Sequence, residues 1–314
     1  MNYAASEQVR CKYCTSIEVI RFGKVHGQQV FQCKKCTHRF FNNGQLNRMK
    51  VKKHVVVAAL NLYFDGLSVR KTQKQLEQLL GEKVNSSTIY RWLVKYSALV
   101  SKYCESEMNP QTSRFWHEDE TMIKVRNGGA KTADGEIHNA WFWEVIDEET
   151  RFLVASHLSG ERTIEETTKI FEKTVKVTKE KPITMYVDGS NSYDRAFNKV
   201  FFTIHKSGRP CLVKRVGIKA RQTNNIAERL HGTLKDRLKP MRGLKNSETA
   251  KILLDGYVVN YNYVRKHQAI KKTPAQAAGL DITNGWSELI DRATEDKAKG
   301  DVESKRIALI EVKA

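Results

Sequence analysis

The sequence predicts a multidomain chain in which an α/β part with a mixed five-stranded sheet follows two smaller units, a cysteine-rich ribbon and an all-α segment. Four cysteines fall in pairs within the first 36 residues, apolar residues recur at helical spacing from residue 51 to 96, and strand-like and helix-like runs alternate after Pro110. Since 314 residues exceed what one core usually spans, we expect domains at 1–45, 46–108 and 109–280, then a charged helical tail at 281–314.

The paired cysteines predict a zinc ribbon. Two Cys-x-x-Cys motifs stand 18 residues apart, and we expect their four thiolates to bind one Zn²⁺: Cys11, Cys14, Cys33 and Cys36. Strand-like runs at 17–22 and 29–32 would hold the motifs together, and zinc would supply the stability that so short a segment lacks. Two unrelated reduced pairs are the alternative.

Residues 51–96 predict three helices. Apolar residues recur at i, i+3, i+4 and i+7 from Val55, Gly66 breaks the pattern, Ser68 supplies an N-cap for the second helix, and the third begins at Asn85. Such a unit is similar to a helix-turn-helix, whose last helix lies in the major groove of DNA. A generic three-helix linker with a solvated basic face is the alternative. The candidate groove residues are Ser86, Ser87, Thr88, Arg91 and Lys95.

Beyond Pro110 the pattern changes to strands. We expect strands at 115–125, 140–146 and 152–158, with turns at 127–129 and 147–150. A helix at 161–178, a buried strand at 183–187, a helix at 193–200 and a short strand at 201–205 follow. Three antiparallel strands followed by alternating helix and strand predict a mixed sheet covered by helices.

The charge predicts a polyanionic partner. The chain carries a formal net charge of +19, and residues 1–110 hold 18 Lys and Arg against 7 Asp and Glu, a net charge of +11. Nucleic acid is the plainest such partner, although a basic protein of the ribosome or of a membrane surface would share the composition. Because no long apolar run or secretory signal is present, we expect a cytoplasmic, nucleoid-associated protein without membrane contact.

Three separated carboxylates predict a site for two divalent cations, Mg²⁺ or Mn²⁺: Asp119, Asp188 and Glu228. Asp119 lies within a predicted strand, where a charge is costly unless it is paired or binds metal. Asp188 follows a buried strand, where ligand-binding groups collect, although an Asp-Gly turn would also explain it. Strand alternation puts Glu118 and Glu120 on the opposite face from Asp119, so we expect only the face of Asp119 to form the site.

Glu228 begins a predicted helix and has two interpretations. With Asn225 it forms a capping box, yet Lys235 and Lys239 fall within about 40° of it around the helix, which favours a face that binds metal and DNA together. No phosphate-binding glycine loop or nucleotide fingerprint is present, so we expect no nucleotide cofactor.

Together these motifs resemble the DDE transposases of bacterial and archaeal insertion sequences, over roughly residues 10–280. The resemblance is carried by His117-Glu-Asp119-Glu-Thr121, by Asp188-Gly, and by Asn224-Asn-x-x-Glu228-Arg229 with Lys235 seven residues after the glutamate. It implies the ribonuclease-H-like fold that this family shares with retroviral integrases.

The resemblance also implies an activity. Water would cleave DNA at the element's ends, and the freed 3′-hydroxyl would attack target DNA. Asp119 would bridge both ions, Asp188 and Glu228 would each hold one, and Lys235, Lys239 and Arg229 would contact DNA. The family acts as homo-oligomers on paired ends. A catalytically silent DNA-binding regulator and a structure-specific nuclease on the same fold are the rival hypotheses.

Overall fold

The computed structural model describes residues 9–14, 16–42, 46, 49, 51–126, 139–190, 192–204, 208–214, 225–241 and 244–311. The turn expected at 127–129 lies outside these residues, as does Asn224. Among the described helices, none combines the length and the apolar character that crossing a bilayer requires.

The N-terminal unit is a three-stranded antiparallel sheet in the order β1-β2-β3, formed by Val19–Val25, Gln28–Cys33 and Arg39–Phe41. His26 and Gly27 both have positive φ, 47° and 77°, as a two-residue turn between right-twisted strands requires. Cys11, Cys33 and Phe40 form a small buried cluster, which is separate from the main core.

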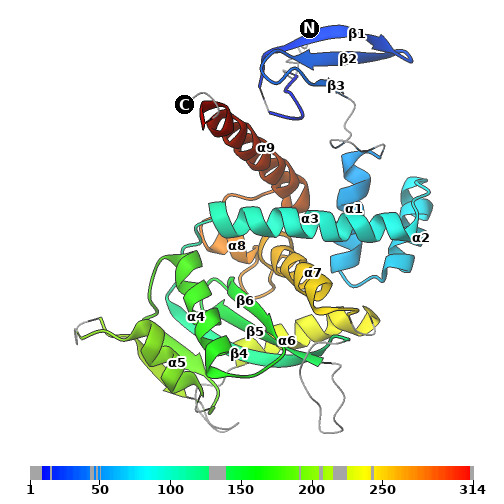
Figure 1. The fold of residues 1–314 in the computed structure, drawn as a ribbon. Coiled ribbons are helices and arrows are strands. Elements are labelled where there is room, and N and C mark those ends of the chain that lie inside the picture. Colours follow the sequence, from blue (N-terminus) through cyan, green and yellow to red (C-terminus); the bar gives the residue numbers. More distant parts are fainter. Residues whose placement is uncertain are drawn as a thin grey trace.

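Three helices follow: α1 (Lys53–Phe64), α2 (Val69–Leu80) and α3 (Ser86–Glu107). The side chain of Ser68 caps α2 by accepting a hydrogen bond from the Lys71 amide, as expected, and Gly81 ends α2 at φ 68°. α3 extends beyond α1 and α2 and packs against α7 (Ser247–Val259) and α9 (Gly285–Glu311) (Figure 1).

The mixed five-stranded sheet is confirmed, with the order β6-β5-β4-β7-β8. β4 (Phe115–Lys124), β5 (Asn139–Asp147) and β6 (Leu153–Ser159) are antiparallel, whereas β7 (Thr184–Val187) and β8 (Cys211–Lys214) run parallel to β4. α4 (Ile164–Thr178) and α5 (Ser192–Phe201) pack on each other, α4 also packs on β5 and β6, and α6 (Asn225–Leu238) packs on β4 and β5.

The strand expected at 201–205 is wrong. Phe201 is buried in the last turn of α5, whereas Phe202 and Ile204 are 59% and 87% exposed and belong to no strand. This apolar run therefore resembles a strand in sequence but has no sheet to pack on. The fifth strand is instead β8, whose sequence Cys-Leu-Val-Lys is apolar but only four residues long.

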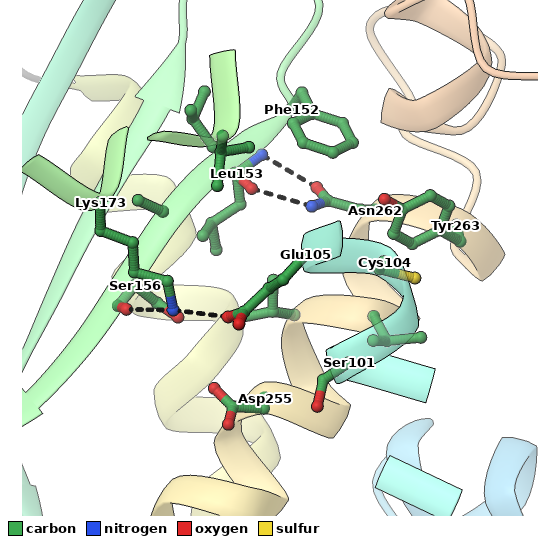
Figure 2. Close-up of a pocket in the computed structure, with 15 residues that line it drawn as sticks. Ser101, Cys104, Glu105, Phe152, Leu153, Ser156, Lys173, Asp255, Asn262 and Tyr263 are labelled. Carbon is green, nitrogen blue, oxygen red and sulfur yellow. Dashed lines mark hydrogen bonds and ion pairs between the residues drawn. The ribbon is translucent and has the colours of Figure 1, made fainter. Parts of the chain in front are cut away.

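C-terminal elements close the core. A 3₁₀ turn, η1 (Lys239–Met241), follows α6, a π-helical turn, η2 (Asn260–Val264), follows α7, and the short α8 (Pro274–Ala277) precedes α9. Figure 2 shows the Asn262 amide facing edge strand β6, where it donates to the Leu153 carbonyl and accepts from the Leu153 amide, both at 2.9 Å. The start of α9 packs on the core, since Trp286 is buried and stacks on Phe64 of α1.

Candidate active site and metal centres

Parallel pairing of β4 with β7 brings Asp119 and Asp188 together. The last paired residues are His117 and Tyr186. Asp119 and Asp188 each follow two positions later, on neighbouring chain segments. One oxygen each of Asp119, Glu120 and Asp188 lie within 4.8 Å of one another. Carboxylates at this spacing from two strands fit the hard oxygen ligands that Mg²⁺ and Mn²⁺ prefer.

Asp119 faces α6. Its partner across the strands is Glu144 of β5, which is fully buried, and His231 of α6 lies over both carboxylates. The ring of His231 places Nε2 3.1 Å from Glu144 and Nδ1 3.7 Å from Asp119. Burial opposes protonation of His231, but the two carboxylates outweigh it and raise its pKa. The buried His231 ring, between two carboxylates, therefore supports the position of Asp119.

Glu118 and Glu120 face α5, as strand alternation predicts. The Tyr193 hydroxyl of α5 donates to Glu120, and the Arg162 guanidinium forms ion pairs with Glu120 and with Asp188, the latter at 2.8 Å. The expectation that only the face of Asp119 forms the acidic cluster is wrong, because the Glu120 carboxylate lies in the cluster as well.

In this cluster the pKa values of Asp119 and Glu120 are raised, so the ionised form of both carboxyl groups is disfavoured. Burial, and then the charges of Asp188 and Glu228, raise the pKa of Asp119, while His231 acts to lower it. Burial also raises the pKa of Glu120 to about 7, despite Tyr193 and Arg162. A divalent cation would relieve both the desolvation and the mutual repulsion.

Glu228 lies in the first turn of α6 and is exposed. Within the described residues its carboxylate is not among the oxygens that gather within 4.8 Å, although its charge acts on Asp119. Arg229, Lys235 and Lys239 are exposed along α6 and η1. Convergence of the glutamate with the two aspartates thus stays a prediction.

The four cysteine sulfurs of the N-terminal unit form a second candidate metal centre. All four lie within 4.8 Å of one another, and the Cys11–Cys36 and Cys14–Cys33 pairs are each 3.5 Å apart. A tetrahedral zinc with Zn–S bonds of 2.3 Å needs sulfurs about 3.8 Å apart, so the cluster has the size for that ion. Burial acts against ionisation of Cys33, but hydrogen bonds from Cys36 and Cys14 lower its pKa to about 7.

The groove candidates occupy the first three turns of α3. Ser87, Arg91 and Lys95 are exposed, whereas Ser86 and Thr88 are half-buried. The Arg91 guanidinium donates to the Ser87 carbonyl at 3.3 Å and to the Thr88 hydroxyl at 3.2 Å. These residues therefore form a continuous polar face that could meet a partner.

Sequence reasoning missed Glu144, His231 and Arg162. Glu144 is a charge within an apolar strand, the same signal that singled out Asp119. His231 lies three residues after Glu228, one helical turn along α6. Arg162 precedes α4 in a loop, and nothing in its neighbourhood marks it.

Residues 113–268 match a family model described as a DDE domain. No curated protein matches the chain. Among solved structures, the simian T-cell lymphotropic virus intasome in complex with the PP2A regulatory subunit B56 gamma is 12% identical, with a TM-score of 0.39, covering 70% of this chain and 74% of its own. The Drosophila P element transposase strand transfer complex is 8% identical, with a TM-score of 0.36 and coverages of 84% and 82%. The Mos1 mariner paired end complex with Mn is 12% identical, with a TM-score of 0.31 and coverages of 80% and 80%.

Proposed function

The chain belongs to the DDE-type transposases, and on this premise we propose that it cleaves DNA at the ends of a mobile element and joins the freed 3′-hydroxyl to target DNA. One observation carries the proposal: in a chain of net charge +19, two strands of the DDE domain bring Asp119 and Asp188 to one sheet edge. In a strongly basic chain that binds a polyanion, an acidic cluster would repel the phosphates unless it binds cations, which then contact those phosphates.

In this proposal Asp119, Asp188 and Glu228 hold two magnesium or manganese ions. Bound there, the ions would activate the attacking oxygen and stabilise the leaving oxygen of an in-line displacement at phosphorus. His231 and Glu144 keep the Asp119 carboxylate in place, and Arg162 balances Glu120 and Asp188. Neither a nucleotide cofactor nor a covalent protein–DNA intermediate is needed.

DNA contacts in this proposal come from two parts of the chain. Lys235 lies on the same side of α6 as Glu228, Lys239 follows in η1, and Arg229 is the residue after the glutamate. All three are exposed and would hold the strand near the cleaved phosphate. The helices α1 to α3 would act as a helix-turn-helix, with the exposed face of α3 in the major groove.

The remaining units have structural roles in the proposal. The four N-terminal thiolates hold one zinc ion, which stabilises a ribbon too small to fold without it. We place the domain boundaries at residues 45, 108 and 280 and expect a homo-oligomer on paired DNA ends, acting in the cytoplasm at the nucleoid, where its DNA substrate lies.

Cleavage of end DNA tests the proposal. The DNA that flanks the gene is searched for short inverted repeats, and a labelled duplex carrying them is incubated with the full chain and Mg²⁺. We expect nicking followed by joining, abolished by Asp119→Asn without loss of DNA binding, and retained by Asp281→Asn, which removes an exposed carboxylate. Binding without any nicking would favour a silent regulator, and nicking without joining would favour a nuclease.

A further inference from the structure

A hollow of about 450 Å³ lies beyond the acidic cluster, between the end of β4 and the end of α6. Its lining combines two kinds of side chain. Met122, Leu238 and Met241 contribute apolar surface, and the ammonium groups come from Lys124, Lys235 and Lys239. No acidic residue is among the residues that line it.

Within the described part of the chain, the three lysines form no short ion pair. All three are exposed, and none takes part in an ion pair of 4 Å or less with a described carboxylate. Phosphates alone would satisfy the lysines but would have no use for the thioether and leucine surface between them. A ligand suited to both has an apolar face and at least one flanking anion, which describes a nucleotide in a strand.

The hollow lies on the same strand and helix as the candidate catalytic residues. Met122 and Lys124 follow Asp119 by three and five positions on β4, or about 10 to 17 Å at the rise of an extended strand. Lys235 follows Glu228 by seven positions, or about 10 Å along the helix. At about 3.4 Å of axis per nucleotide, this distance corresponds to roughly three to five nucleotides of DNA.

We infer that this hollow is a binding site for one unpaired nucleobase of the DNA, three to five nucleotides from the cleaved phosphate, whose flanking phosphates contact the lysines. The inference rests on the proposed function, since it places the base relative to the cleaved bond. The apolar lining shields the faces of the base, while the lysine ammonium groups stay in water beside the backbone. Taking the base out of the duplex costs a few kcal/mol, which is least for a base that is already single-stranded.

Binding of a 20-base-pair duplex to the full chain, without divalent metal, tests the inference. The same duplex is compared blunt and with a five-nucleotide single-stranded extension, which carries 2-aminopurine at one of its five positions in turn. We expect the extension to tighten binding about tenfold, the effect of removing some 55 Å² of apolar base surface from water. The 2-aminopurine fluorescence should change at one position, and an abasic site there should abolish the tightening.

Two variants locate the effect, and one serves as a control. Met122→Ser should remove the advantage of the extension and leave the affinity for blunt duplex unchanged. Lys239→Ala, an exposed change that does not threaten folding, should weaken binding of the extended duplex more than of the blunt one. Lys199→Ala on α5 removes another exposed lysine, away from the hollow, and should lower both affinities alike, if at all.

The possible outcomes distinguish failure of the inference from failure of the proposed function. Equal affinity of the wild-type chain for blunt and extended duplexes overturns the inference and leaves DNA binding intact. A tightening that survives Met122→Ser and Lys239→Ala places the base elsewhere and also overturns it. Binding of neither duplex removes DNA as the partner, and the inference with it.

Discussion

Asp255 of α7 allows a quantitative test of how burial raises the pKa of a carboxyl group and thereby changes the stability of the fold. Its carboxylate lies near Glu105 and Lys173, but the Lys173 ammonium is engaged by Glu105 at 2.7 Å and by the Ser156 carbonyl at 3.1 Å (Figure 2). Burial, only partly offset by the charge of Lys173, raises the pKa of Asp255 from 3.8 to about 6. The folded chain therefore binds a proton at this site more tightly than the unfolded chain does.

The sign of the pH dependence follows from this difference. Stability from the protonated carboxyl is fully present below pH 3.8 and is lost as the pH rises through about 6. Loss of that stability amounts to about 1.6 kcal/mol at pH 5 and about 3 kcal/mol at pH 8. Asp255→Asn, which cannot ionise, should therefore gain about 1.4 kcal/mol in its free energy of unfolding relative to wild type between these two pH values.

Urea unfolding of both proteins at pH 5 and pH 8 measures this quantity. Asp281→Asn removes an exposed aspartate and serves as the control, for which we expect a much smaller change between the two pH values. An Asp255→Asn advantage that is constant with pH, or that shrinks as the pH rises, would refute the reasoning.

Three further changes test packing, the buried ion pair and the cysteine cluster. A Cβ on Gly256 would lie 2.2 Å from the Ser97 hydroxyl, whereas one on Gly232 would meet nothing within 4 Å, so in thermal unfolding Gly256→Ala should destabilise by about 1–3 kcal/mol and Gly232→Ala should stabilise by about 0.5–1 kcal/mol. Similar shifts for both alanines would contradict this. His231→Leu leaves the buried Glu144 without its cation and should cost about 3–5 kcal/mol in urea unfolding; adding Glu144→Gln should recover part of that loss, and no recovery would argue against the pair. Cys33→Ser should lose about one zinc per chain by elemental analysis, and an unchanged zinc content would remove this cysteine from the site.

The sequence predicted the parts of the fold whose signals are local. Gly66 marked the end of one helix and Ser68 the start of the next, because both signals depend on near neighbours. Phe202 misled for the same reason: an apolar run predicts a strand only if a sheet lies beside it, and burial is decided by distant residues.

The part of the candidate site that could be predicted is the part that lies at the end of a recognisable strand. Asp188 was expected at a sheet edge because it follows a buried strand, and it lies there beside Asp119. Glu120 entered the cluster through a side-chain conformation that no periodicity encodes. The support from Glu144 and His231 depends on which strand pairs with β4 and which helix crosses it, and this is tertiary information.

α3 belongs to two parts of the molecule at once. Its 22 residues span about 33 Å, its first turns lie beside α1 and α2, and Glu105 near its end pairs with Lys173 of α4. A helix that is packed at both ends moves as one rigid unit. Gly256 allows α7 to pack closely against the middle of α3, at Ser97. If α3 binds a DNA sequence, the protein therefore fixes the distance between that sequence and the bond that is cleaved. Inserting or deleting a base pair between them moves the scissile bond away from the acidic cluster.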